Sequence, residues 1–298
     1  MEVCDLAPLA KRPSTLDALR RLADMLPEYP CRPALGMQYG EQNKYVSWTF
    51  DPAEFSSIEI LHITDTQFGH VECQVDRIVE YRDWVLLKPN RFVLFGGDMV
   101  DAANVMSPGS PWENLCDSQS QVYKFCELVA PMRHRILGYV GGNHERRGLK
   151  TFGDLGVLIA MLLRVPYSNG RQLIDINYGE YNVKGYNRPF QIDLWHGRGA
   201  AQTDGSKVQM VSNYVKAHPG SDLYLTGHLH DCFMFQKFRE RRISDKQNVK
   251  IMKYYFGMSS SFLNTWGTYA EVMGLTITDV AMLRCVLEPS GHSEMTIR

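Results

Sequence analysis

The sequence predicts an α/β fold, because short apolar segments alternate with helical patterns through its first half. Strand-like runs lie at 58–64, 91–95 and 136–140, and longer amphipathic or apolar runs separate them. The second half is instead rich in strand-like segments with few helical patterns between them. A second, mixed sheet packed on the first is therefore expected, with helices flanking the two sheets.

The helical elements follow from apolar residues at helical spacing. A leucine pattern at 14–26 begins behind Ser14 and Thr15, which are good N-caps, and YVSWTF at 45–50 then alternates like a strand. The later helical patterns lie at 71–87, 117–130 and 155–164. Residues 1–56 are accordingly expected to form an N-terminal extension of a helix and a strand.

The strands of the second half are expected where β-branched and aromatic residues alternate with polar ones between turn-forming residues. These segments are 172–178, 181–187, 189–196, 222–228, 232–238, 249–256 and 271–279. The basic stretch 237–250 joins two of them and is interpreted as a polar hairpin turn, although it could also follow a nucleic-acid backbone.

Composition narrows the class of protein. A chain of 298 residues with 44% hydrophobic residues can bury a full core, and its net charge of −1 does not indicate a strongly cationic nucleic-acid binder. Its seven cysteines are scattered along the chain and odd in number, which indicates reduced thiols and not a disulfide framework. The longest nearly unbroken apolar stretch, Leu155–Leu163, is far shorter than the ~20 residues that span a bilayer. We expect a soluble protein of the cytoplasm, or of a host cytoplasm if the source is viral, without membrane contact.

Five apolar strands are each followed directly by residues that can bind metals. Because ligand sites in open α/β sheets lie at the carboxyl ends of strands, these residues are expected to converge. Two divalent cations about 3.5–4 Å apart need a bridging carboxylate, further Asp, Asn and His ligands, and glycines that let the chain turn at once. The five motifs are D-T-Q at 65–67, G-G-D-M-V-D at 96–101, G-G-N-H-E at 141–145, W-H-G at 195–197 and G-H-L-H at 227–230.

This ordered set resembles the calcineurin-like metallophosphoesterase superfamily, whose pattern is D-x-H, G-D, G-N-H-[DE], a single His and G-H-x-H. The resemblance covers roughly residues 57–235 and implies a four-layer αββα sandwich of two mixed β-sheets flanked by helices, with 57–298 as the catalytic domain. It also implies a phosphate-ester substrate and two divalent metal ions. Mn²⁺ is the ion that we expect, with Mg²⁺, Fe and Zn²⁺ as alternatives.

The resemblance also implies a role for each motif residue. Asp98 would bridge the two metals, His144 would contact the phosphate and protonate the leaving oxygen, and Asp101 would orient His144. The ligands implied for the first metal are Asp65, Gln67, Asp98 and His230, and those for the second are Asp98, Asn143, His196 and His228.

One position departs from the family pattern, because Gln67 stands where D-x-H has its histidine. An amide oxygen is a weaker donor than imidazole, so Gln67 tunes the first metal site toward harder ions or marks a degraded site. The stretch 195–208 is more loosely similar to a glycine-rich H-G-x-G segment of phage and bacterial members.

Other polar residues near the motifs are candidates for binding substrate. Arg146, Arg147 and Arg198 could hold phosphate oxygens, although neighbouring arginines also form ordinary solvated faces. His70 could face the site or lie at the start of a helix, whereas His62 lies inside its strand and is expected to be a core histidine.

Three functions are compatible with these residues. The preferred one is a phosphodiesterase or nuclease that acts on nucleic acid or a nucleotide. The second is a phosphomonoesterase for a nucleotide or phosphoprotein, which the G-D-x-x-D spacing favours. The third is a non-catalytic binding protein with a degraded metal site. The residues leave the oligomeric state open.

Overall fold

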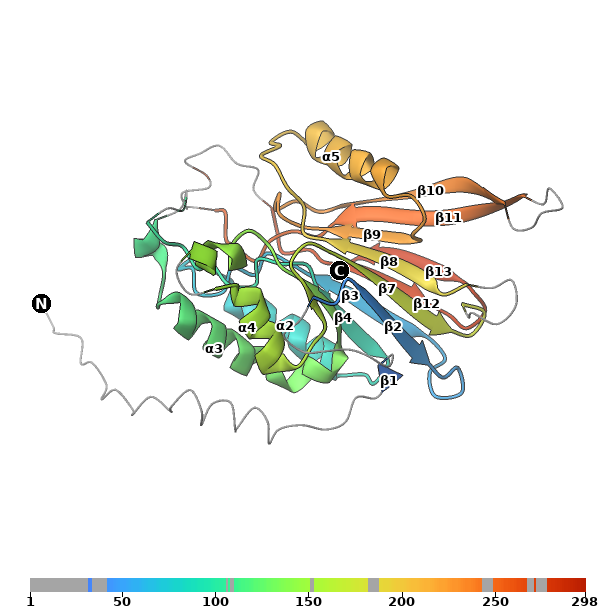
Figure 1. Ribbon diagram of the computed structural model, residues 1–298, viewed down its shortest axis with the longest axis horizontal. Helices are drawn as coiled ribbons and strands as arrows, with labels where there is room; N and C mark the ends of the chain where they lie inside the picture. Colours follow the sequence, from blue (N-terminus) through green and yellow to red (C-terminus); the bar gives the residue numbers. More distant parts are fainter. Residues whose placement is uncertain are drawn as a thin grey trace, which may run out of the picture.

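Two β-sheets lie face to face in the computed structural model, and helices cover their outer faces (Figure 1). The structure describes residues 32–33, 42–105, 107, 110–150, 153–181, 188–242, 249–266, 271 and 278–298. The helices α2, α3 and α4 cover one sheet, and α5 covers the other (Figure 1). This arrangement confirms the predicted αββα sandwich.

The six-stranded sheet has the order β13-β12-β3-β4-β5-β6. Its central strands β3, β4 and β5 are parallel and completely buried, as expected for apolar runs covered on both faces. β12 and β13 complete the sheet in antiparallel register. The strands are β3 (Ile58–Ile63), β4 (Arg91–Phe95), β5 (Ile136–Val140), β6 (Tyr167–Ser168), β12 (Leu283–Leu287) and β13 (Ser293–Ile297).

The seven-stranded sheet has the order β1-β2-β7-β8-β9-β11-β10. It is mixed, because β2 pairs with β7 in parallel whereas β7 and β8 are antiparallel. The predicted strand at 45–50 is therefore part of a main sheet. The strands are β1 (Arg32–Pro33), β2 (Tyr45–Phe50), β7 (Arg171–Tyr178), β8 (Phe190–Trp195), β9 (Leu223–Thr226), β10 (Phe233–Arg242) and β11 (Val249–Met258).

Polar side chains at the N-termini fix where three of the helices begin. Asp117, Asp154 and Thr203 each accept a hydrogen bond from a backbone N–H in the first turn of α3, α4 and α5. The α-helices are α2 (Val75–Leu86), α3 (Ser118–Val129), α4 (Leu155–Leu163) and α5 (Asp204–Ala217), and the 3₁₀ helices are η1 (Pro111–Glu113), η2 (Ala130–Arg135) and η3 (Glu145–Lys150).

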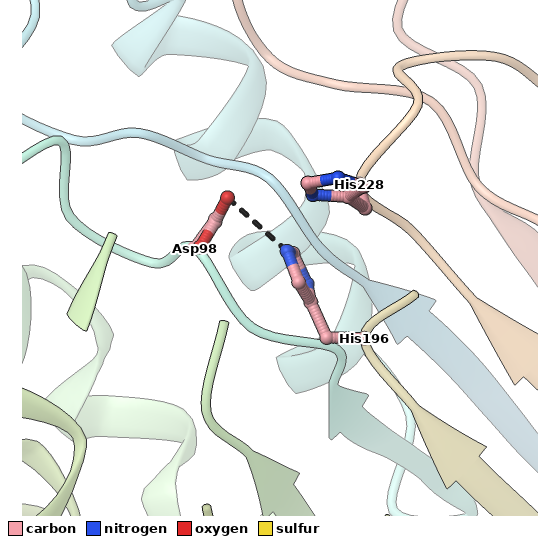
Figure 2. A group of neighbouring side chains, drawn as sticks. All are labelled: Asp98, His196 and His228. Carbon is pink, nitrogen blue, oxygen red and sulfur yellow. Dashed lines mark ion pairs between the residues drawn. The ribbon is translucent and has the colours of Figure 1, made fainter. Parts of the chain in front are cut away.

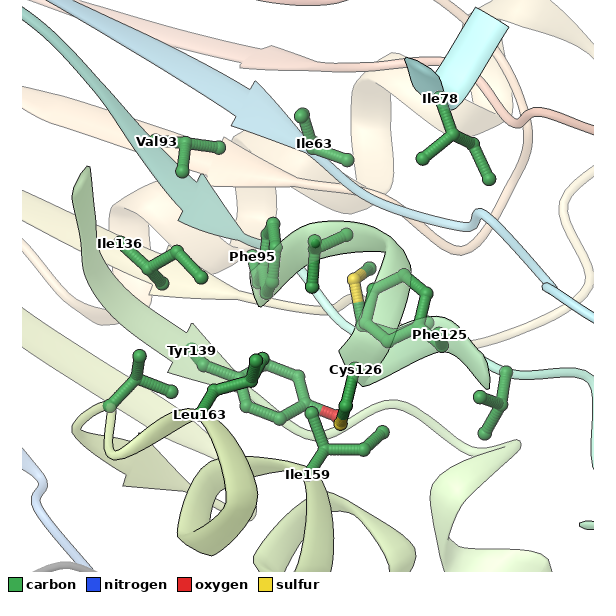
Figure 3. Close-up of a cluster of buried hydrophobic side chains, with 14 of the residues drawn as sticks. Ile63, Ile78, Val93, Phe95, Phe125, Cys126, Ile136, Tyr139, Ile159 and Leu163 are labelled. Atoms are coloured by element: carbon green, nitrogen blue, oxygen red, sulfur yellow. The ribbon is translucent and has the colours of Figure 1, made fainter. Parts of the chain in front are cut away.

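Apolar side chains fill the layers on both sides of the six-stranded sheet. Phe95 and Tyr139 from the sheet meet Phe125 of α3 and Ile159 of α4 (Figure 3). A second cluster fills the space between the sheets, where the Trp48 indole donates to the Leu137 carbonyl at 2.8 Å. The rigid sheets position the loops at the carboxyl ends of their strands, where the candidate site lies.

Several elements differ from the sequence-based expectations. The helix α5 was not predicted, because its many polar residues, which include serine and asparagine, weaken the helical spacing of its apolar residues. The strands β12 and β13 were not predicted either. The predicted helix at 14–26, residues 182–187 of one predicted strand and most of the segment 271–279 lie outside the described residues. None of the helices in the described part of the chain has the length and apolar composition needed to cross a membrane.

Candidate metal centre

The motif residues come from loops at the carboxyl ends of five strands that belong to both sheets. Three of these strands lie side by side in the six-stranded sheet, and the other two are neighbours in the seven-stranded sheet. Asp65 and Gln67 follow β3, Asp98 and Asp101 follow β4, Asn143 and His144 follow β5, His196 follows β8, and His228 and His230 follow β9.

Asp98, His196 and His228 form the centre of this group (Figure 2). Each offers one ligand atom, and these atoms all lie within 4.8 Å of one another. The Asp98 Oδ2 atom is 3.2 Å from His196 Nε2, which also lies 3.2 Å from the Oδ1 atom of Asn143. The three side chains therefore present nitrogen and oxygen donors to one point, as divalent transition metals require.

Asp65, Gln67 and His230 form a second group beside the first. The Nε2 atom of His230 lies 3.4 Å from Asp65 Oδ1 and 3.1 Å from the amide nitrogen of Gln67. Asp65 is fully buried, yet its Oδ1 atom has no hydrogen-bond partner. Because an unsatisfied buried carboxylate oxygen is costly, a cation at this position fits the donors present.

Hydrogen bonds to backbone carbonyls orient two of the histidines. His196 uses Nδ1 toward the Gly96 carbonyl at 2.8 Å, which leaves Nε2 facing Asp98. His228 uses Nε2 toward the Gly199 carbonyl at 2.8 Å. Metal-binding histidines commonly donate their second N–H in this way, because the bond fixes both the ring and its tautomer.

The backbone at the site is held in an uncommon conformation. Seven described non-glycine residues have positive φ, and five of them are candidate ligands: Asp65, Gln67, Asp98, His228 and His230. Such strain concentrates at functional sites, where the surrounding structure must hold it in place.

Glycines allow the ligand loops to approach one another closely. A Cβ atom on Gly142 would lie 2.0 Å from Asp98 Oδ1, and one on Gly227 would lie 2.3 Å from Asp65 Oδ2. Glycine is therefore required at these positions for the space that it leaves beside a carboxylate, since neither residue has a positive φ.

The carboxylates and histidines inside the site shift one another's pKa values. Burial opposes the charge on His196, but the Asp98 and Asp65 carboxylates outweigh it and raise the pKa of His196 to about 10. Burial likewise opposes ionisation of Asp98, yet the neighbouring His144 and His196 hold the pKa of that carboxyl well below its usual range. The carboxylates thus attract positive charge into a buried site, and a metal ion would take the place of the proton.

His144 lies beside the ligands in contact with Asp101 and Arg147. Its Nδ1 atom is 2.7 Å from the Asp101 carbonyl oxygen and 3.1 Å from Asp101 Oδ1. Its Nε2 atom is 2.9 Å from Nη2 of Arg147 and 3.6 Å from Asp98 Oδ2. Both ring nitrogens therefore face groups that can set their protonation.

Glu145 is a residue of the site that the sequence reasoning did not single out. Its carboxylate is fully buried and accepts hydrogen bonds from the backbone N–H groups of Asp98 and Gly142 at 3.0 and 2.9 Å. It also accepts from the N–H of Met99 at 2.6 Å. Glu145 thus joins the loops after β4 and β5. Its position in the G-N-H-E motif is the feature of the sequence that could have identified it.

The other predicted residues lie around this centre with different contacts. Arg146 donates to the Asn169 carbonyl, the His70 ring lies 3.7 Å from Glu113, and Arg198 is exposed on the loop after β8. Their role in binding substrate stays a prediction. His62 is fully buried with its Nδ1 atom 2.8 Å from Ser259 Oγ, as expected for a core histidine.

The sandwich carries a group of possible metal ligands at the carboxyl ends of its strands. A family model described as calcineurin-like phosphoesterase matches residues 58–232, which is more than half of the chain. The chain therefore belongs to the calcineurin-like phosphoesterase family, whose members use divalent metals and act on phosphate esters. Membership of this family indicates a phosphoric ester hydrolase.

Three solved structures that match the chain have low sequence identity and low TM-scores. A conserved uncharacterised protein of Streptococcus pneumoniae, a predicted phosphoesterase, is 15% identical with a TM-score of 0.35 and covers 82% of this chain and 99% of its own. A serine/threonine phosphatase of Saccharomyces cerevisiae is 10% identical with a TM-score of 0.39 and covers 94% and 87%. The NAD nucleotidase of Haemophilus influenzae is 12% identical with a TM-score of 0.34 and covers 80% and 49%. No curated protein matches the chain.

Proposed function

We propose that this chain is a two-metal phosphodiesterase that hydrolyses phosphodiester bonds in nucleic acid or a nucleotide. The observation that carries the proposal is the placement of Asp98, whose Oδ2 atom lies 3.2 Å from His196 Nε2 and 3.6 Å from His144 Nε2. A carboxylate in this position can bridge two cations while the phosphate remains within reach of a proton donor.

The two groups of donors would each hold one cation, with Mn²⁺ as the proposed ion. Asp65, Gln67, Asp98 and His230 would hold the first, and Asp98, Asn143, His196 and His228 would hold the second. When bound, the cations would lower the pKa of a water molecule and neutralise charge on the phosphate. Gln67 offers an amide oxygen where the family pattern has an imidazole nitrogen, and this harder donor favours a hard ion.

His144 would protonate the leaving oxygen through Nε2. In the structure, Nδ1 faces two oxygens of Asp101, so it carries a proton, whereas Nε2 faces a guanidinium N–H of Arg147. Burial opposes a charge on His144, but Asp98 and Asp101 outweigh it and raise the pKa of His144. Protonation at Nε2 would release Nη2 of Arg147 to bind a phosphoryl oxygen, while Nη1 of the same guanidinium stays on Asp101.

The charge around His144 supports a diester substrate over a monoester. A diester carries one negative charge near neutral pH, whereas a monoester carries up to two. Arg147 lies at His144, but it shares its charge with Asp101, and Arg146 is bound to the Asn169 carbonyl. This modest positive charge suits the singly charged ester better.

The test compares hydrolysis of bis(p-nitrophenyl) phosphate and p-nitrophenyl phosphate with Mn²⁺. Asp98→Asn is the test variant, and Asp204→Asn, which changes an exposed residue of α5, is the matched control. We expect the wild type and the control to prefer the diester and Asp98→Asn to lose activity. Preference for the monoester would support a phosphatase, and wild-type inactivity with every metal tried would support a binding protein.

A further inference from the structure

Gln121 of α3 is a buried polar side chain that lies outside the motifs of the metal centre. It is 0% exposed and makes three hydrogen bonds. Its Oε1 atom accepts from the N–H of Ala102 at 2.8 Å, and its Nε2 atom donates to Asn114 Oδ1 at 3.1 Å and to the Cys116 carbonyl at 3.0 Å. One side chain therefore uses both its donor and its acceptor to connect two separate segments.

The first of these segments is the turn that carries Asp101. Ala102 has a φ of 49°, which is unfavourable for an L-residue, so its conformation needs an external constraint. The hydrogen bond from Ala102 N–H to Gln121 supplies that constraint one residue after Asp101. Asp101 itself donates its N–H to the Phe68 carbonyl at 3.1 Å, so the turn is held on both sides.

The second segment supports the same turn from outside. Asn114 receives a hydrogen bond from Gln121 and donates its own amide to the Ala103 carbonyl at 2.8 Å. Packing leaves Gln121 little freedom, since a Cβ atom on Gly69 would lie 2.4 Å from its Cδ atom. The chain of contacts thus runs from α3 through the turn to Asp101, and from Asp101 to Nδ1 of His144.

We propose that Gln121 is a positioning residue for the reaction, because it holds the Asp101 turn in the geometry that aims His144 at the leaving oxygen. This inference rests on the proposed function. It assigns a role in proton transfer to a residue of α3, a helix that lies outside the motifs of the metal centre.

The experiment uses methyl aryl phosphate diesters with two leaving groups, p-nitrophenol and phenol. Phenol is the poorer leaving group and depends more on protonation by His144. Gln121→Met keeps the length of the side chain and removes its hydrogen bonds. We expect it to lower kcat about 10- to 100-fold on the phenyl ester, but only about threefold on the p-nitrophenyl ester, with KM nearly unchanged.

The matched control is Gln119→Met on the same helix, where an exposed glutamine donates to the Tyr123 hydroxyl. We expect wild-type kinetics from this control. Gln121→Glu retains an acceptor for Ala102 N–H and should show the same selective loss to a smaller degree, which also serves if Gln121→Met does not fold. Amide hydrogen exchange of Ala102 should be faster in Gln121→Met than in the control.

Two results would overturn the inference. One is an equal loss on both esters by folded Gln121 variants, because a general structural defect would not depend on the leaving group. The other is wild-type kinetics in Gln121→Met. An inactive wild type would instead refute the proposed function, and this outcome is distinct from activity that is insensitive to Gln121.

Discussion

Gly142→Ala is a test of how closely the ligand loops must approach. The added Cβ atom would lie 2.0 Å from Asp98 Oδ1 and 2.5 Å from the backbone nitrogen of Asp98, both far below any normal contact. The carboxylate would have to move by about 1 Å, a displacement that can cost about 100-fold in rate when it occurs at a reacting centre. Its hydrogen bond from the His144 N–H, 2.8 Å long, would be disturbed at the same time.

We expect Gly142→Ala to weaken Mn²⁺ binding about 10- to 100-fold, as is typical when the support of a ligand is lost, and to lower kcat by a similar factor. Titration calorimetry and diester hydrolysis measure the two effects. Gly170→Ala is the matched control, since a Cβ atom there meets nothing within 4 Å. Wild-type Mn²⁺ affinity and turnover in Gly142→Ala would refute the reasoning.

Three further predictions concern the proposed acid His144, the proposed ligand Asp65 and the core histidine His62. In calorimetry, His144→Ala should retain Mn²⁺ binding. In steady-state kinetics, it should lose about 100- to 10,000-fold in kcat on esters with poor leaving groups, and unchanged turnover would remove His144 from the mechanism. Asp65→Asn keeps an acceptor for the His228 N–H but removes a carboxylate. Burial opposes the ionisation of Asp65, yet His196 and His230 outweigh it and lower its pKa, so the metal-free Tm of the variant near pH 7 should fall below that of the wild type. Its gain in Tm with Mn²⁺ should also be smaller, and an equal gain would contradict the ligand assignment. Burial lowers the pKa of His62 from its ordinary 6.5 to about 3, so the unfolded chain takes up a proton first as the pH falls. His62 alone should therefore lower the stability by about 1.4 kcal/mol per pH unit between about pH 6 and pH 3. Urea unfolding of His62→Gln should show a shallower dependence of stability on pH, and an identical dependence would exclude His62.

The sequence was sufficient for the parts of the fold that local patterns encode. β3, β4 and β5 are apolar throughout because both faces are covered, and α3 and α4 begin at aspartates that act as N-caps. The order of the motifs along these strands then predicted which residues would meet. The helix α5 was missed because its mixed polar composition weakens the helical spacing of its apolar residues. The face that it buries becomes evident only from its packing against β11 and the neighbouring strands.

The parts of the site that the sequence did not reveal depend on tertiary hydrogen bonds. Glu145 and Gln121 are ordinary residues in the sequence, and their importance follows from the backbone N–H groups that they meet across loops. The direction of an arginine is equally unpredictable, since Arg146 and Arg147 are neighbours, yet one binds the Asn169 carbonyl and the other reaches Asp101. Positive φ at five candidate ligands is likewise a product of the assembled loops.

The most direct test of the two-metal centre is the number of Mn²⁺ ions bound per chain, measured by equilibrium dialysis with elemental analysis for the wild type and Asp98→Asn. The account predicts two ions in the wild type and at most one weakly held ion in Asp98→Asn, because Asp98 is proposed to bridge both. Two tightly bound ions in the variant, or none in the wild type, would contradict it.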